Sequence, residues 1–284
     1  MSINNCAIVT DSTCDLICAQ ELGICVVPLK VYFGAEEFLD NVDIKPHVFY
    51  KRLRTQKIMP RTSQPSPGDF LYAYTSLKQA GVNKIISIHL SSKLSGTTQS
   101  ALTASSMIEG MDIRVIDSKF ASLGLGFLCL QAKNYINELN NLDEAIFKIK
   151  EDIKKVIIYF SVGSLDYLEK GGRIGKAKAF LGKLLDLKPI LGVEGGQIKP
   201  VNKVRGGLKE AGRNIAGLIK KDIGMVRKLQ FLGVIHSCLP QEAGDLADLL
   251  KNDLGDFPIL IAELGCVLGS HVGPKALGVV ALRA

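Results

Sequence analysis

One stretch constrains the fold more than any other: an apolar run that leads into a turn crowded with hydroxyl groups. Residues 85–90 have the composition of a buried strand, and a helix is predicted to run through Ala101 to Ile108. In an open parallel sheet, ligands bind beyond the carboxyl ends of the strands, where a helix N-terminus offers free N–H groups. The turn therefore either caps the helix or receives a small anionic group such as a carboxylate or phosphate. Its hydroxyls belong to Ser91, Ser92, Ser95, Thr97 and Thr98.

Strands and helices alternate along the first part of the chain. This alternation predicts an N-terminal, doubly wound parallel sheet with helices on both faces. A hairpin is predicted at 31–40, with Gly34 at its turn. We expect the strand at 156–160 to be the last one of this half. The predicted strands cover 7–10, 23–30, 85–90, 113–118 and 156–160, the helices 12–22, 46–54, 70–80, 101–108 and 142–151, an apolar helix opens at 122–127, and a hairpin covers 31–40.

The second part of the chain has a different order of elements. A short helix at 165–174 is stopped by a glycine pair and followed by an apolar helix, and two strands at 188–193 and 197–204 flank the turn Gly195-Gly196. Further on, the pattern predicts helices at 207–221 and 241–251 and strands at 229–236 and 257–262. These elements predict a two-layer α/β domain with a mixed sheet. At 284 residues two domains are expected, and we place them at 1–160 and 161–284.

Charge and composition narrow the function classes. The net charge is +7, and the basic excess is concentrated between Lys170 and Lys228. Such a surface is compatible with nucleic acid, an anionic membrane, an acidic partner or a solvated face. Because the chain has no Trp and only 6% aromatic residues, a base-stacking surface is not expected. The first residues lack the features of a secretory signal, and the seven cysteines include no C-x-x-C pair, so we expect a cytoplasmic protein with reduced thiols.

Familiar catalytic motifs are missing from the sequence. It contains no G-x-S-x-G elbow, no Walker A loop, no complete dinucleotide fingerprint and no H-E-x-x-H pair. What remains is a rigid loop at 60–70, which holds Thr62 and Ser63 among three prolines, and a histidine framed by glycines, His271. A neutral imidazole donates one hydrogen bond to an oxyanion, and the flanking glycines let the backbone approach a ligand closely. The alternative for His271 is a packed, hydrogen-bonded side chain. No metal or cofactor is predicted.

Together these segments resemble the DegV family, the fatty-acid-binding proteins of bacteria. Each segment is only moderately specific, whereas their order and spacing along nearly the whole chain are highly specific. One departure is Lys275, where the family usually has glycine after Pro274. The matching segments are 8–16, 62–66, 91–97, 99–101, 115–118, 168–174, 188–191, Arg205 and 269–274.

The resemblance implies a two-domain α/β protein that holds one long-chain fatty acid between its domains. It also implies that the acid is handed to a separate ATP-dependent kinase, which makes acyl phosphate for phospholipid synthesis. By motif, Thr62 and Ser95 would bind the carboxylate, and Ser63, Gly96 and His271 would border the head group. Arg173 and Arg205 would face the kinase. The protein itself would be a carrier and not an enzyme, with transient contact to an anionic membrane as a further possibility for its basic face.

Two other functions stay open from the residues alone. The first is a hydrolase or acyltransferase that uses one of the serines with His271 as base, although no elbow motif or orienting acid supports it. The second is a nucleic-acid-binding regulator, which rests only on the basic second half of the chain. The resemblance favours the lipid carrier over both.

Overall fold

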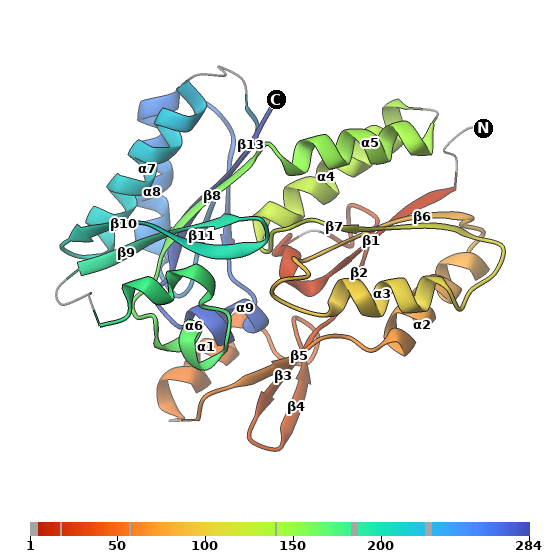
Figure 1. Ribbon diagram of the computed structural model, residues 1–284, viewed down its shortest axis with the longest axis horizontal. Helices are drawn as coiled ribbons and strands as arrows, with labels where there is room; N and C mark the ends of the chain where they lie inside the picture. The colour runs from red at the N-terminus through yellow and green to blue at the C-terminus, as the bar shows by residue number, and fades with distance from the viewer. Residues whose placement is uncertain (1–4, 18, 57, 140, 183–186, 225–228) are drawn as a thin grey trace.

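The first sheet consists of four parallel strands. The computed structural model describes residues 5–17, 19–56, 58–139, 141–182, 187–224 and 229–284. The strands lie in the order β2-β1-β6-β7 (Figure 1). This arrangement confirms the predicted parallel N-terminal sheet. The strands span Cys6–Asp11 (β1), Ile24–Val27 (β2), Lys84–His89 (β6) and Asp112–Asp117 (β7).

Helices cover both faces of this sheet. Successive residues of a strand point to opposite faces. Val9 and Ile85 accordingly pack in one cluster with α2 and α3, whereas Ile8 and Ile86 pack in another with α4 and α5. The sheet is therefore doubly wound, as predicted. The helices span Pro67–Gln79 (α2), Thr97–Ser105 (α3), Leu123–Glu138 (α4) and Leu142–Ile153 (α5).

The second sheet is mixed and has six strands in the order β10-β9-β8-β13-β11-β12. Only the pair β11 and β12 is parallel, and the other neighbours are antiparallel. Helices α7 (Leu208–Gly224) and α8 (Pro240–Leu254) pack on one face in a cluster of their own (Figure 1). The predicted two-layer α/β domain with a mixed sheet is confirmed. The strands span Val156–Ser161 (β8), Leu187–Glu194 (β9), Gln197–Arg205 (β10), Leu229–His236 (β11), Ile259–Glu263 (β12) and Leu277–Arg283 (β13).

Strand β8 lies in the other sheet from the one we expected. It pairs with β13 and β9 and has no part in the four-stranded sheet, so the expectation that it completes the first half is wrong. The apolar run 156–160 specifies a buried strand, but partner choice depends on contacts with residues more than 100 positions further along the chain. The domain division at 1–160 and 161–284 stays a proposal, and the pairing of β8 favours a start of the second domain before Val156.

A third, small sheet joins the two halves. It has the order β4-β3-β5, and its hairpin turns at Gly34 with φ of +62°, as predicted. Helix α1 packs Phe49 and Tyr50 against this sheet and against helix α9. Strand β5 thereby brings Thr62 next to α9. These elements span Lys30–Phe33 (β3), Glu36–Leu39 (β4), Pro46–Thr55 (α1), Arg61–Ser63 (β5) and Cys266–Val272 (α9).

Three helix predictions need correction. The helix expected over 12–22 is only a 3₁₀ turn, η1 at Ser12–Cys14, which ends at Asp15 with φ of +51°. The helix at 165–174 is shorter, α6 at Asp166–Lys170, and the apolar helix after it is a 3₁₀ segment, η2 at Gly175–Phe180. Residues 183–186, which belong to the expected apolar helix, lie outside the described residues. Helix α9 and strand β13 were not predicted from the sequence.

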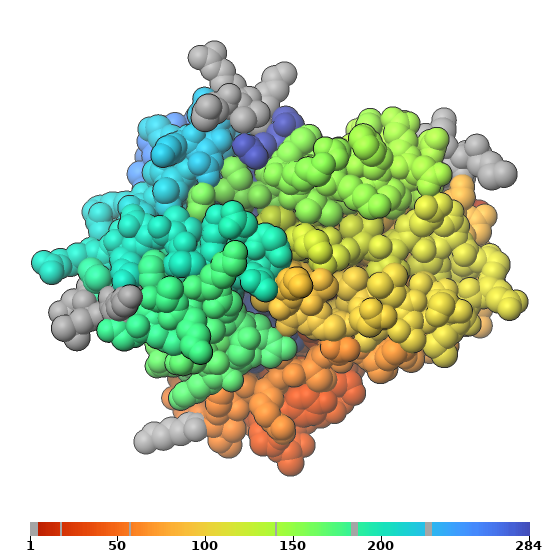
Figure 2. All heavy atoms as spheres, viewed as in Figure 1, coloured from red at the N-terminus to blue at the C-terminus, as the bar shows by residue number. Residues whose placement is uncertain are grey.

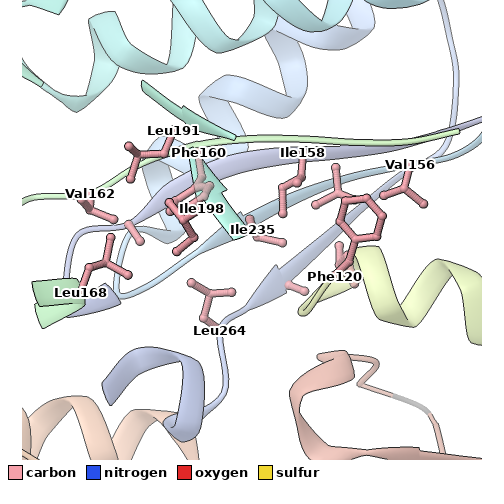
Figure 3. Close-up of a cluster of buried hydrophobic side chains, with 14 of the residues drawn as sticks. Phe120, Val156, Ile158, Phe160, Val162, Leu168, Leu191, Ile198, Ile235 and Leu264 are labelled. Atoms are coloured by element: carbon pink, nitrogen blue, oxygen red, sulfur yellow. The ribbon is translucent and has the colours of Figure 1, made fainter. Parts of the chain in front are cut away.

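The face of the mixed sheet opposite α7 and α8 points toward the first half of the molecule. Figure 3 shows side chains of β8, β9, β10 and β11 gathered there with Leu168, Leu264 and Phe120. The start of α4 joins this cluster through Leu123 and Phe127. In the space-filling view the green and cyan atoms of the second half meet the yellow and orange atoms of the first half along a seam (Figure 2). The site described next lies between the halves.

Within the residues that the structure describes, no helix combines the length and apolar character needed to cross a membrane.

Candidate functional site

A largely apolar cavity of about 430 Å³ lies between the two halves. This volume falls in the usual range for small-molecule sites. Ile158 and Phe160, two residues apart on β8, both face it, and Figure 3 shows them beside Ile198, Ile235 and Leu264. No Asp or Glu lies among the described residues that line it. The apolar wall is formed by Leu29, Leu90, Leu94, Ala121, Ile158, Phe160, Leu168, Val193, Ile198, Ile235, Leu264, Val267, Leu268 and Val272.

Polar side chains from four separate segments line the same cavity. Strand β5 and the residue after it contribute Thr62, Ser63 and Gln64, and the turn after β6 contributes Ser95. Helix α9 contributes His271, and the segment after α6 contributes Arg173. Contacts connect them, since His271 reaches Thr62 and Arg173 reaches the turn at Leu94. The polar groups therefore form one cluster, apart from Ser122, which also lines the cavity.

His271 is tied to Thr62. Its Nε2 lies 2.8 Å from Thr62 Oγ1. Burial, and secondarily the positive charge of Arg173, lower the pKa of His271 to about 4, so the ring is neutral at pH 7. Its Nδ1 is buried without a hydrogen-bond partner among the described residues. A Cβ on Gly171 would lie 2.4 Å from this Nδ1, so only glycine at 171 leaves room for the ring.

The turn after β6 combines structural and cavity-lining hydroxyls. Ser91 Oγ donates to Gly196 O at 2.8 Å, and Thr98 Oγ1 donates to Leu90 O at 3.2 Å. Ser95 Oγ lies 2.9 Å from Thr97 Oγ1 and faces the cavity. The N-cap position of α3 is taken by Gly96, which supplies no side-chain cap. The hydroxyls of Ser91 and Thr98 therefore hold neighbouring segments, and Ser95 Oγ, which lines the cavity, also accepts from Thr97 N at 3.4 Å at the start of α3.

The other residues predicted for the site are Arg173, Arg205 and Gly96, and the structure places them in different surroundings. Arg173 is half-buried in the cavity wall, where Nε donates to Leu94 O at 3.0 Å and Nη1 donates to Gly171 O at 2.7 Å. Arg205 is exposed and borders a separate surface hollow. Gly96 packs against the amide of Gln64, whose Oε1 would lie 2.3 Å from a Cβ there. The roles predicted for these residues stay predictions.

A sequence profile of the DegV family, described as uncharacterised proteins, matches residues 5–284. This chain belongs to the DegV family. A Thermus thermophilus structure described as fatty acid binding of a DegV family protein is 33% identical, with a TM-score of 0.91 over 99% of this chain and 100% of its own. DegV of Bacillus subtilis, described as a fatty acid binding protein, is 32% identical, with a TM-score of 0.90 over 99% of each chain. A stearic acid-binding protein of Eubacterium ventriosum is 26% identical, with a TM-score of 0.90 over 97% of each chain.

The glycines around His271 serve packing in this DegV chain. A Cβ on Gly269 would lie 2.6 Å from Tyr50 Oη and one on Gly273 would lie 2.4 Å from Tyr167 Cδ2, while the close approach of a ligand to this backbone stays a prediction. They let α9 press against aromatic side chains, and Gly273 ends the helix with φ of +73°. Lys275 also has φ of +73°, so a lysine adopts here the left-handed conformation that glycine favours.

Sequence reasoning missed two residues of the site. Gln64 lines the cavity and donates from Nε2 to Ser100 Oγ at 3.1 Å. Gly171 makes room for His271, whereas the glycine pair in the sequence indicated only the end of a helix. The signal for Gln64 was its place in the loop at 60–70. No sequence pattern indicates that Gly171 contacts a ring 100 residues away.

The buried polar side chains closest to a catalytic arrangement form hydrogen bonds outside the cavity. Ser270, the serine beside His271, is buried and donates to Cys266 O at 2.8 Å. Asp11, His89 and Ser87 form a hydrogen-bonded chain that has no exposed surface and lies outside the cavity wall. His89 is therefore structural. Among the described residues, no group of three or more His, Cys, Asp or Glu side chains is placed to hold a metal ion.

Proposed function

We propose that this protein binds a long-chain fatty acid in the cavity, with the carboxylate at Thr62 and Ser95. The observation that carries the proposal is a cavity of about 430 Å³ whose wall is apolar except for one connected group of hydroxyls, an imidazole and a guanidinium. An acyl chain with one terminal anionic group matches this distribution. The fatty-acid-binding proteins with the same fold support it.

The hydroxyl groups are prepared to donate to a carboxylate. A buried carboxylate is costly unless its oxygens receive hydrogen bonds. The neutral ring of His271 can donate from Nε2 to Thr62 Oγ1, which leaves the hydroxyl proton of Thr62 for the ligand. Thr97 Oγ1 can donate to Ser95 Oγ and free the Ser95 proton in the same way. Arg173 adds a positive charge to the same wall, where no described acid opposes it.

The acyl chain supplies most of the attraction. At about 0.8 kcal/mol per buried methylene, about 15 methylenes give roughly 12 kcal/mol before costs. Association and ordering subtract much of this. The side chains that line the cavity from β8, β10 and β11 are Ile158, Phe160, Ile198 and Ile235, all of them apolar. The tail therefore determines the affinity, and the hydroxyls determine which end faces Thr62.

We propose further that the bound acid is presented to a separate ATP-dependent kinase. The absence of a Walker A loop in the sequence fits an arrangement in which the partner binds ATP. Neutral hydroxyl donors bind the carboxylate without the rigid bidentate geometry of a guanidinium, so one carboxylate oxygen stays available to attack a phosphoryl group. Arg205, exposed on the second half, is the proposed contact with the kinase.

The first experiment identifies the ligand. The purified protein is denatured and extracted with organic solvent, and the released lipids are identified by mass spectrometry. We expect close to one fatty acid per chain. An empty extract, together with failure to take up added fatty acid, would overturn the proposed function.

The second experiment tests the head-group residues. Thr62→Val and Ser95→Ala remove the hydroxyls with little change in volume, and Thr103→Val changes an exposed residue of α3 as a control. Each lost hydrogen bond to a carboxylate is worth about 1.5–3 kcal/mol, so fatty-acid affinity is expected to fall roughly tenfold to 100-fold in the first two variants. Equal affinities in all three would place the carboxylate elsewhere.

The third experiment tests the kinase contact. Arg205→Ala is compared with Arg213→Ala, an exposed arginine of α7 that pairs with Glu210. We expect Arg205→Ala alone to lower acyl phosphate formation by the kinase while fatty-acid affinity is unchanged. If Arg205→Ala weakens fatty-acid binding instead, the residue belongs to the lipid site.

A further inference from the structure

Three of the buried polar side chains in the segment 8–16 form hydrogen bonds to distant parts of the chain. Asp11, Ser12 and Asp15 are 0%, 3% and 8% exposed. We propose that they are positioning residues, which hold the turn of Ser95 and helix α9 in place and so set Ser95 against Thr62 and His271. The importance of this positioning for ligand binding rests on the proposed function, whereas the hydrogen bonds themselves do not.

Asp11 holds the start of the turn after β6. Its Oδ2 accepts from Leu90 N at 2.9 Å and lies 3.2 Å from His89 Nδ1. Its Oδ1 accepts from the backbone N and the hydroxyl of Thr13 at 3.1 and 2.6 Å. Leu90 is the residue after β6 and itself lines the cavity. One carboxylate therefore fixes both the 3₁₀ turn η1 and the point from which the Ser95 turn departs.

Asp15 holds the start of helix α9. Its Oδ1 accepts from Gly265 N at 3.0 Å, although the two residues are 250 positions apart. Gly265 is the N-cap of α9 and has no side chain to satisfy the free N–H groups there. The other oxygen of Asp15 accepts from Ser122 Oγ at 2.6 Å. Because Ser122 lines the cavity, Asp15 joins one wall of the cavity to the helix that carries His271.

Ser12 reaches the same helix through Asp40. Ser12 Oγ donates to Asp40 Oδ2 at 2.8 Å and accepts from Leu29 N at 3.1 Å. Asp40 Oδ1 in turn accepts from Cys266 N at 3.0 Å. The first two N–H groups at the start of α9 are thus held by Asp15 and Asp40.

The shortness of α9 makes these contacts decisive. A helix of seven residues gains little stability from its own hydrogen bonds, so its position depends on what holds it. Phe49 and Tyr50 pack against its side and limit its depth. The two carboxyl groups fix its axial position and rotation, and His271 follows one and a half turns later. A shift at Gly265 is therefore transmitted to the bond between His271 and Thr62.

Asparagine is the conservative replacement at position 15. Burial raises the pKa of Asp15 to about 8, so this carboxyl group is mostly neutral at pH 7. An amide keeps an acceptor for Gly265 N, and its NH2 group can donate to Ser122 Oγ in place of the hydrogen bond that Ser122 donates to Asp15. Alanine removes both contacts. Both variants are uncharged at position 15, so comparing Asp15→Asn with Asp15→Ala isolates the contribution of the hydrogen bonds.

The experiment measures His271 in lipid-free protein and then the affinity for a fatty acid. Histidine-labelled protein gives the ring ¹⁵N resonances by NMR, and His271→Ala assigns that of His271. We expect Asp15→Ala to shift this resonance and to weaken palmitate binding roughly tenfold, and Asp15→Asn to restore both. Asp152→Asn is the matched control, because it changes a buried carboxyl group of α5 that accepts from Tyr135 Oη of α4, away from the cavity. It is expected to lower stability and leave the His271 resonance unchanged.

Folded Asp15→Ala protein with an unchanged His271 resonance would overturn the positioning role. If Asp15→Ala does not fold, Ser12→Ala is judged by the same resonance, since it removes the hydrogen bonds to Asp40 and Leu29 and leaves those of Asp15 in place. A wild-type protein that takes up no fatty acid would end the proposed function, whereas the shift of His271 in the lipid-free variants would still establish the positioning.

Discussion

Replacing Gly171 by alanine tests the site with a single methyl group. The backbone at Gly171 has φ of −74° and ψ of −7°, which alanine adopts without strain. The space around it decides the outcome. The new Cβ would lie 2.4 Å from His271 Nδ1 and 2.9 Å from Tyr167 O, both closer than real Cβ contacts allow. The imidazole must therefore move.

The expected cost follows from these contacts. Overpacking of a tight site costs about 1–3 kcal/mol. Displacement of the ring also breaks the hydrogen bond between His271 Nε2 and Thr62 Oγ1, which is worth about 1 kcal/mol. We expect Gly171→Ala to lower the free energy of unfolding by roughly 2–4 kcal/mol. Fatty-acid affinity should fall about tenfold, because Thr62 loses the group that orients its hydroxyl.

The assay is urea unfolding followed by titration with a fatty acid. Gly244→Ala is the matched control, because Gly244 lies within α8 and a Cβ there meets nothing within 4 Å. It is expected to stabilise the protein by about 1 kcal/mol, as alanine does in a helix interior. A double-mutant cycle with His271→Ala isolates the clash, since the shorter side chain at 271 makes room for the new methyl group.

Simple addition of the stability costs of Gly171→Ala and His271→Ala would refute a clash between the new methyl group and the imidazole. A change in the free energy of unfolding equal to that of the control Gly244→Ala would refute the clash as well. Either result would mean that the ring of His271 does not occupy the space beside Gly171.

Two further predictions concern backbone strain and protonation. Lys275→Gly should raise the free energy of unfolding by about 0.5–1 kcal/mol in thermal denaturation, because relief of the left-handed conformation at φ of +73° outweighs the extra chain entropy of glycine; a loss of stability would contradict this. Burial lowers the pKa of His271 from 6.5 to about 4, so between these pH values the unfolded chain binds a proton at this residue and the folded chain does not. Folding stability from the neutral His271 is therefore fully present above pH 6.5 and is lost as the pH falls toward 4. Wild type should therefore lose about 3 kcal/mol relative to His271→Ala across this window in urea unfolding, and parallel curves would contradict the buried, neutral ring.

Local sequence patterns predicted much of the fold because helix caps and turns depend on the conformational preferences of neighbouring residues. Helix α2 follows Ser66, whose hydroxyl accepts from Asp69 N in a capping box. The hairpin of β3 and β4 turns at Gly34, where φ is positive. Neither feature depends on distant residues, so both are visible in the sequence.

The failures have an equally physical cause. The segment 12–22 has helix-start residues, but Asp11, Ser12 and Asp15 are bound to Leu90, Asp40 and Gly265, so the chain stops after one 3₁₀ turn. These tertiary hydrogen bonds override a weak helical preference. Strand β8 joined the mixed sheet for the same kind of reason, because pairing depends on which strands are near.

The sequence by itself determined the alternation of strands and helices, the hydroxyl-rich turn of Ser95 and the resemblance to the DegV family. These are properties of residue order, and local propensity and motif spacing express them directly. Only the tertiary structure decided that Arg173 lines the cavity, that Gly171 makes room for His271, and that Asp15 reaches a helix 250 residues away. Such contacts depend on the packing of segments far apart in the chain, and packing is fixed only when the whole chain has folded.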